Sequence, residues 1–513
     1  MIGWQPPDSR DARFALRYIP VGGANNNEQG VPVPDIVVAF VHGWSVTDKG
    51  TYGRLPEAPA AAGAAAGVDI ETRNIYLGRY ISFHDEVTIP DLARAMNHAV
   101  AQDLKGVSTF SCITHSTGGP LVRAWVDIFY GAKRLDECPL KHLVMLAPAN
   151  HGSALGVLGK ERVGRIKSFF EGVEPGQGVL DWLCLGSSGA WDLADRFTYY
   201  TLKDNGFYPF VLSGETIDKR FYDFVNSYLR EEGSDGVVRL AGANMNYTFF
   251  RLEQTEDRYS DVAAADDDEG PETQKAGYIL KLVQRPRSRP PETAFGVIPD
   301  ASHSGDRIGI MGSVTPANAA TKPVVDEILK CLKVETDAQY AQRITDLATA
   351  TEKAQKDAGP GHRRFVMFVF RVSDKEGLTI GDYDLFLLGD DFRRRKLPPG
   401  FFVDRQKNSQ SQALVYYLDY DKLIQATHLG IRVDARPVYS EPEGAPTAFA
   451  GYLRAEFRLS GSQFKKFVNA NEAVYVDIVL RRIVDTETFR FERLGTGKDD
   501  FEDADPAGPV PSS

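Results

Sequence analysis

Cysteine is scarce in this chain. Its 513 residues include four cysteines, and no two of them form a C-x-x-C pair. Disulfide-rich secreted domains need many cysteines and thiolate zinc sites need closely spaced pairs, so the sequence indicates neither. We expect all four thiols to be reduced and buried; they are Cys112, Cys138, Cys184 and Cys331.

Long hydrophobic runs and an excess of positive charge are also missing. No stretch reaches the roughly 18 apolar residues that a membrane-spanning helix needs. The first residues, MIGWQPPDSRDARFALRYIP, lack the basic start and apolar run of a signal peptide. The net charge of -11 argues against a nucleic-acid partner bound through bulk charge. We expect a protein made in the cytoplasm and exported, if at all, by a system that reads no cleavable signal.

The first part of the chain alternates short apolar segments with segments of helical spacing. Apolar runs rich in β-branched residues are typical of buried parallel strands. We expect strands at 35–41, 109–116, 142–148 and 207–214, and helices at 90–106 and 118–131. Strands and helices in alternation predict an α/β domain with a mainly parallel sheet.

The length suggests two or three domains. We expect residues 1–335 to form the α/β domain, with the glycine-rich and aromatic-rich segment 150–204 as a lid; a surface excursion that only packs is the alternative. Residues 336–361 are polar and predict a helical connector. Residues 362–498 hold short strands rich in Val, Phe and Tyr, which favours a β-sandwich of about seven strands. The composition of residues 499–513 predicts a disordered acidic tail.

The segment Thr114-His115-Ser116-Thr117-Gly118-Gly119 lies between a predicted strand and a predicted helix. A serine with small residues two positions away on either side is typical of a nucleophile elbow. The turn is so tight that larger neighbours would collide. The helix that follows points its amides and its positive dipole end at the serine, which favours a developing oxyanion. Thr114 stands where glycine is usual, and this departure leaves the mechanics intact.

His42-Gly43-Trp44 follows the first predicted strand. An oxyanion hole in this architecture takes one amide from the residue after the nucleophile and one from the loop after an early strand. We therefore expect the amides of Thr117 and Trp44 to serve, with Gly43 allowing the close approach. The alternative is that the His-Gly pair only ends a strand.

A serine nucleophile needs a histidine base, and the base needs an acid, in the chain order serine, acid, histidine. Of nine histidines, His303 lies in a loop of small residues near the end of the α/β part. Asp235 lies in a turn before a strand with glycines close on both sides; the alternative is a turn aspartate that bonds its own backbone. The other candidate acids lack one of these features: Asp218, Asp223, Asp261 and Asp300.

The chain resembles the α/β-hydrolase superfamily, and within it bacterial lipases and lipase-like enzymes related to the GPI inositol deacylase. The motifs that carry the resemblance are FVHGW, THSTGG, LAPANHGS, SDGVV and ASHSG, between residues 35 and 330. The resemblance implies a nucleophile at Ser116, an acid at Asp235, a base at His303 and oxyanion amides at Trp44 and Thr117. It does not cover the C-terminal strands.

These residues predict a serine esterase that cleaves acyl esters of lipids, most simply a phospholipase A or lipase. The lipid assignment depends on aromatic and apolar residues of the lid segment, which would line an acyl-binding surface: Phe169, Phe170, Trp182, Leu183 and Trp191. A short-chain esterase, a thioesterase or an amidase could use the same triad. A catalytically inactive interaction module is the remaining alternative.

A lipase-like part joined to a C-terminal β-rich part, with no signal peptide, also resembles antibacterial phospholipase effectors of the type VI secretion system. The expected partners are a phospholipid substrate, a membrane surface, and a secretion component or immunity protein. Phe401 and Phe402 would support membrane docking if exposed, although paired aromatics are more often core. The mechanism needs no cofactor. The acidic run 266–269 predicts a solvated loop, with a calcium site as the alternative.

Overall fold

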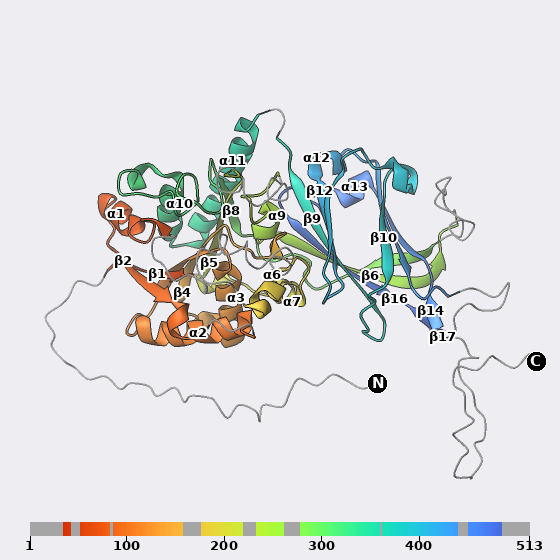
Figure 1. Cartoon of the computed structure of the whole chain (residues 1–513), viewed down its shortest axis with the longest axis horizontal. Coiled ribbons are helices and arrows are strands. Elements are labelled where there is room, and N and C mark those ends of the chain that lie inside the picture. The colour runs from red at the N-terminus through yellow and green to blue at the C-terminus, as the bar shows by residue number, and fades with distance from the viewer. Residues whose placement is uncertain are drawn as a thin grey trace, which may run out of the picture.

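The computed structural model describes residues 34–42, 52–82, 86–156, 176–218, 232–260, 277–359, 362–439 and 450–484. A sheet flanked by helices occupies one side of the molecule and a curled sheet occupies the other (Figure 1). Several predicted features lie outside the described residues: Trp44, Phe169, Phe170, the acidic run 266–269 and the C-terminal tail.

The first sheet has six strands in the order β2-β1-β3-β4-β5-β8, and every neighbouring pair runs parallel. This confirms the predicted parallel α/β sheet. Its strands are β1 (Ile36–His42), β2 (Ile70–Tyr76), β3 (Phe110–His115), β4 (Leu140–Leu146), β5 (Tyr208–Gly214) and β8 (Ala294–Ile298).

Helices cover both faces of the parallel sheet, which is why its strands are apolar at successive positions. In β1, Ala39 and Val41 belong to the core under α2 (Ile89–Asp103) and α3 (Gly118–Phe129). Val38 and Phe40 belong to the core on the opposite face. That face is covered by α1 (Ala58–Ala65), α10 (Pro323–Leu332) and α11 (Asp337–Asp357).

Helix α11 falls where the sequence suggests a connector, and it packs as part of the α/β core. Tyr340 and Leu347 are buried against the strands. The Thr351 hydroxyl accepts a 3.0 Å hydrogen bond from the amide of Val297 in β8. Because β8 is the last strand of its sheet, α11 covers an edge that would otherwise be free to pair with another chain.

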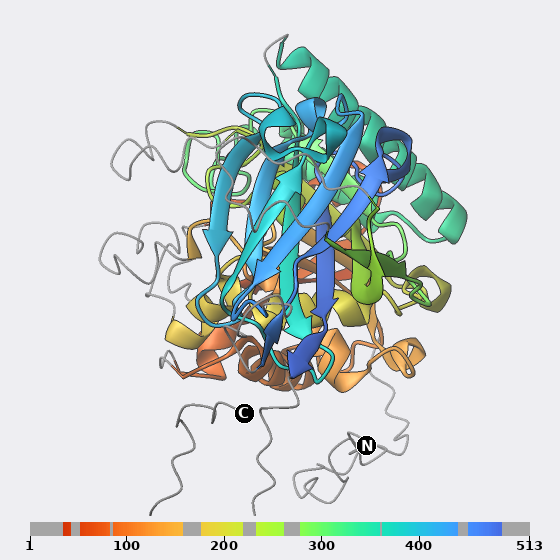
Figure 2. The same cartoon turned by 90° about the vertical axis from the view of Figure 1, so that its right-hand side faces the viewer.

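The second sheet has nine strands in the order β10-β13-β15-β7-β6-β16-β9-β12-β11. Figure 2 shows it curling across one side of the molecule. Its strands are β6 (Tyr247–Arg258), β7 (Tyr278–Val283), β9 (Phe365–Asp374), β10 (Tyr383–Leu388), β11 (Phe402–Lys407), β12 (Leu414–Asp419), β13 (His428–Ala435), β15 (Ala455–Ser460) and β16 (Ala473–Leu480). Strands β14 (Ala450–Tyr452) and β17 (Arg482–Val484) pair separately.

The C-terminal part is therefore all-β in character, as predicted, but one curled mixed sheet replaces the two packed sheets of a sandwich. Strands β6 and β7 lie within residues 1–335, yet they pair with C-terminal strands, so the sheet crosses the boundary expected at residue 335. Both faces of strand β16 are buried without a second sheet packed on it. Tyr475 faces the helical part of the molecule, whereas Val474 and Val476 face the inside of the curl.

The described part of the predicted lid segment is helical and packs into the interior. It contains α6 (Gln177–Leu183) and α7 (Ser188–Phe197). Trp182 and Leu183 are buried in the core beside α2 and α3. Trp191 packs edge-on against Tyr475 and Phe249 of the curled sheet. These three side chains are core residues and not an acyl-binding surface, so that part of the sequence interpretation is wrong.

The remaining short α-helices of the described chain are α9 (Leu240–Ala243), α12 (Tyr420–Leu423) and α13 (Gly461–Phe464). Within the ranges that the structure describes, no helix has both the length and the hydropathy that crossing a bilayer requires.

Tyr475 connects the two sheets through a buried histidine. His151 Nε2 donates to the Asn244 carbonyl at 2.8 Å, which leaves His151 Nδ1 to accept from the Tyr475 hydroxyl at 2.7 Å. We expect Tyr475→Phe to lower the free energy of unfolding by about 1–3 kcal/mol, because it leaves a buried acceptor unpaired. Urea unfolding measures the change in this free energy. Tyr199→Phe, at a tyrosine that is 42% exposed, is the control. Equal midpoints for the two variants would contradict the role of this bond.

Candidate active site

Ser116 lies in the tight turn between β3 and α3. Its φ of 52° is in the left-handed region, where a residue with a side chain is strained. A Cβ on Gly118 would lie 3.0 Å from the Thr114 Cβ, and one on Gly119 would lie 2.6 Å from the Pro148 Cβ. The turn therefore requires its glycines, and it accommodates Thr114 because the residue facing it has no side chain.

The amide of Thr117 begins the helix that follows Ser116. Thr117 is the N-cap of α3, and within the described residues nothing accepts a hydrogen bond from its amide. That amide is free to bind an oxyanion at the positive end of the α3 dipole. Trp44, the second expected donor, lies outside the described residues. The strand before it pairs with β3 in the register Val41↔Thr114, so β1 ends beside the elbow.

His303, Asp235 and Ser116 form one hydrogen-bonded chain. The carboxylate of Asp235 accepts from His303 Nδ1 at 2.9 Å, which leaves Nε2 unprotonated to accept from the Ser116 hydroxyl at 3.1 Å. Asp235 and His303 are almost completely buried. The structure thus brings together the three residues that the sequence pattern singled out, with the imidazole in the tautomer that can remove a proton from a serine.

Backbone amides hold the carboxylate of Asp235 on its other side. Its Oδ1 accepts from the amides of Val237 and Val238 at 3.0 and 2.8 Å. The amide of His303 also donates to the Asp235 carbonyl at 3.0 Å. The side chains of Asp235 and His303 cannot move apart without breaking several of these hydrogen bonds. The orientation of the imidazole is therefore fixed before any substrate binds.

His115, which precedes the serine, supports the loop of His303. Its Nε2 donates to the His303 carbonyl, with 3.2 Å between the two atoms, and the two rings lie 4.6 Å apart. Burial, and then the nearby charge of His303, hold the pKa of His115 well below its usual value. His115 therefore stays neutral beside the base. In the sequence, His115 stands out only as part of the elbow motif, and no local pattern indicates its contact with the loop of His303.

The loop that carries Asp235 is held from behind by the curled sheet. The Tyr417 hydroxyl lies 3.2 Å from each of the carbonyls of Glu232 and Gly233 and donates to them. A Cβ on Gly233 would lie 2.3 Å from the Phe365 ring, so only glycine lets the loop approach the sheet this closely. At the other end of the loop, Arg239 forms an ion pair with Asp404 of β11.

A second serine–histidine pair, Ser111 with His142, is also present, 2.7 Å from oxygen to nitrogen. The other ring nitrogen of His142 donates to the Val334 carbonyl at 2.7 Å. Ser111 lies within β3 rather than at a turn, it is buried, and a backbone carbonyl replaces the acid. This pair fastens β3 and β4 to the chain after α10, and it lacks the geometry of a nucleophile and its base.

Within the described residues, no group of three or more His, Cys, Asp or Glu side chains is placed to hold a metal ion. The acidic run 266–269, where the sequence allowed a calcium site, lies outside them. The hydrogen-bonded chain needs no metal to activate a serine, because His303 supplies the base.

The contact by which the curled sheet supports the loop of Asp235 can be tested at Tyr417. We expect Tyr417→Phe to lower kcat about fivefold with KM unchanged, since it removes about 1 kcal/mol of hydrogen bonding that positions Asp235. Steady-state hydrolysis of an acyl ester measures both constants. Tyr416→Phe is a matched control, because this neighbouring hydroxyl donates to Leu385 on the opposite face of β12. Equal loss in both variants would mean that the effect is general destabilisation.

His142 makes stability depend on pH. Burial lowers its pKa from 6.5 to about 4, so protonation favours the unfolded chain. Its stabilising contribution is complete above pH 6.5 and is lost as the pH falls toward 4, at up to about 1.4 kcal/mol per pH unit. We expect His142→Gln to reduce the pH dependence of the unfolding free energy between pH 6.5 and 4.5, measured by urea titration. An unchanged slope would show that other groups carry it.

Comparison with known proteins places this geometry in a family. No protein-family model matches the chain, and the search of curated proteins found no match. The solved structure of the phospholipase PlaB from Legionella pneumophila matches with 44% identity, covering 90% of this chain and 97% of PlaB, at a TM-score of 0.77. PlaB from the same organism in complex with thio-NAD matches with 41% identity over the same shares, at a TM-score of 0.76.

Both the parallel α/β sheet and the curled C-terminal sheet fall within the matched length, so the likeness extends over the two parts of the chain together. At this identity and coverage, the chain belongs to the family of PlaB-like phospholipases.

Proposed function

We propose that this protein is a serine esterase that hydrolyses acyl esters of phospholipids, with Ser116 as nucleophile, His303 as base and Asp235 as the orienting acid. The observation that carries the proposal is the unbroken chain of hydrogen bonds from Ser116 to His303 to Asp235 at a strained elbow. Kinship with a phospholipase supports the choice of substrate class.

The reaction follows from the positions of these groups. The Ser116 oxygen attacks the ester carbonyl carbon while its proton passes to His303 Nε2, and Asp235 stabilises the imidazolium. The carbonyl oxygen becomes an oxyanion, which the Thr117 amide binds. The tetrahedral species then expels the alcohol, here a lysolipid, and His303 returns the proton to it. Water activated by His303 releases the fatty acid and restores Ser116.

In this proposal the C-terminal strands serve catalysis by supporting the acid loop, through Tyr417 and through the ion pair of Arg239 with Asp404. Membrane docking remains a separate proposal. Phe401 is buried, while Phe402 is 43% exposed, so at most one ring of the pair meets a surface. Delivery by a type VI secretion system and binding of an immunity protein stay predictions from the sequence architecture.

The central test compares two serines that each hydrogen-bond a buried histidine. We expect Ser116→Ala to lower fatty-acid and lysolipid release from mixed phospholipid vesicles by about 10⁴-fold or more, since the nucleophile is lost. It should also abolish labelling by a fluorophosphonate. Ser111→Ala, which breaks the pair with His142, should keep release within a few-fold of wild type.

Retention of hydrolysis by Ser116→Ala would overturn the assignment of the nucleophile. Fluorophosphonate labelling of Ser116 without release from any phospholipid would keep the serine hydrolase and overturn the phospholipid substrate. Mass spectrometry of the lysolipid products would also identify which acyl chain leaves.

A further inference from the structure

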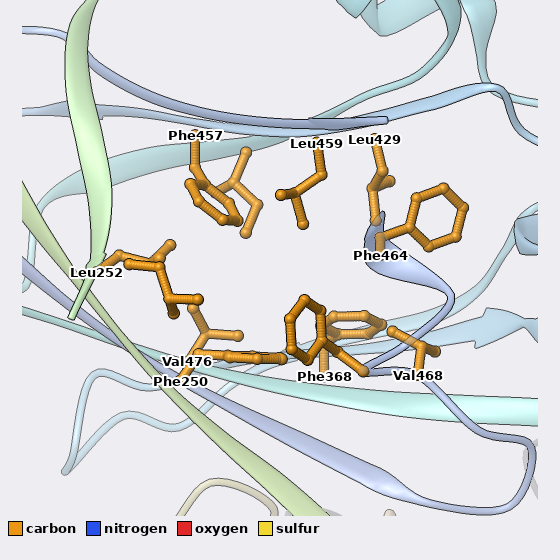
Figure 3. A pocket seen from close by; sticks show the side chains of 12 residues that line it. Phe250, Leu252, Phe368, Leu429, Phe457, Leu459, Phe464, Val468 and Val476 are labelled. Carbon is orange, nitrogen blue, oxygen red and sulfur yellow. The ribbon is translucent and has the colours of Figure 1, made fainter. Parts of the chain in front are cut away.

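We propose that the inside of the curled sheet is a second lipid site, which binds the acyl chain of a free fatty acid away from Ser116. Side chains from β6, β7, β9, β13, β15, β16 and the α13 turn surround a hollow there. In Figure 3 the labelled side chains converge on one space between strands on either side. The lining is Phe250, Leu252, Leu282, Phe368, Leu429, Ile431, Phe457, Leu459, Phe464, Phe467, Val468 and Val476.

Every one of these lining side chains is a hydrocarbon. A ligand in this hollow therefore gains no hydrogen bond or ion pair from the side chains of the wall, and its buried part must itself be apolar. An unfilled apolar hollow lowers stability, because its lining loses contacts that close packing would supply. An acyl chain would restore those contacts.

The hollow reaches solvent where two strands separate. Strands β15 and β7 pair only at Ala455↔Tyr278 and Glu456↔Ile279. Further along the same strands, Leu459 and Leu282 line the hollow without such a pairing. Leu282 is 38% exposed, which is unusual for a leucine that lines an interior space. We infer from the exposure of Leu282 that an acyl chain enters between these strand ends.

The turn at α13 combines the apolar wall with positive charge. Phe464, Phe467 and Val468 line the hollow, whereas Lys465 and Lys466 between them are exposed. No ion pair to either lysine is found in the described parts of the chain. A carboxylate at the end of an acyl chain would therefore meet two available cations in the segment that covers its tail.

The dimensions favour one chain over two. The enclosed space is about 40 Å³, and the hollow with its open side is about 460 Å³. The enclosed space is well below the roughly 300–1,000 Å³ of sites that surround a whole small molecule, so it fits only the end of a single chain. A free fatty acid has one tail and one carboxylate, whereas a phospholipid would leave its second tail in water. The proposed reaction releases a fatty acid, so only the supply of this ligand rests on the proposed function.

The test measures binding with catalysis removed. Full-length Ser116→Ala is titrated with the fluorescent fatty acid cis-parinaric acid, alone and with Leu282→Asp or Leu378→Asp added. Both substitutions put one negative charge at an exposed leucine of the curled-sheet region, but only Leu282 lines the hollow; Leu378 is 60% exposed. We expect saturable binding that Leu282→Asp weakens at least tenfold and Leu378→Asp changes less than twofold.

A second pair of variants tests the recognition of the carboxylate without touching the wall. Lys465→Glu with Lys466→Glu should weaken binding several-fold. The matched control, Lys353→Glu with Lys356→Glu on the exposed face of α11, should not. Circular dichroism confirms that each variant is folded, and the lysine variants decide the matter if Leu282→Asp fails to fold.

Absence of saturable binding, or equal effects of each variant and its control, would overturn the site. Binding to anionic phospholipid vesicles without binding to the free fatty acid would also overturn it and assign the hollow to membrane docking. Hydrolysis by Ser116→Ala would contradict the proposed function instead, so the two failures are distinguishable.

Discussion

The hydrogen bond between Asp235 and His303 depends on two sheets holding one loop between them. His303 follows the last strand of the parallel sheet, and Asp235 lies on a loop whose back rests on the curled sheet. A buried carboxylate that lost its partners would be strongly destabilised. The bond between Asp235 and His303 therefore forms only when the two sheets pack in this arrangement, and breaking the bond would in turn weaken that packing. The two parts of the chain are one catalytic unit.

The features that the sequence predicts well are those with a local physical cause. A serine with left-handed backbone angles requires small neighbours, so Gly118 and Gly119 indicate the elbow in the sequence itself. Asp235 carries its own signal, since glycines let its loop turn and approach a sheet. Apolar runs bounded by turns predict the parallel strands for the same reason: burial on both faces is recorded in each strand separately.

Features that depend on distant partners were not predictable. Alternating residues in β16 show that both faces are buried, but they do not say that its neighbours are β6 and β9. The polar composition of α11 suggested a connector, although a few buried positions suffice to cover β8. Tyr417 lies in an ordinary strand pattern, and its bond to the acid loop exists only once a chain segment nearly two hundred residues away is folded against it. The assignment of Trp191 to an acyl-binding surface was wrong for the same reason, since its ring packs on Tyr475.

The position of β16 in the sheet has a consequence for the order of folding. This strand pairs in parallel with β6 on one side and with β9 on the other, so it joins two segments that are more than a hundred residues apart. Until the ribosome has released residue 480, β6 and β9 have no common neighbour and the curled sheet is divided. Contacts between segments so distant in sequence are slow to form, because a long loop must close first. A nascent chain therefore carries Ser116 long before the support for Asp235 is complete, and we expect activity only after β16 has joined the sheet.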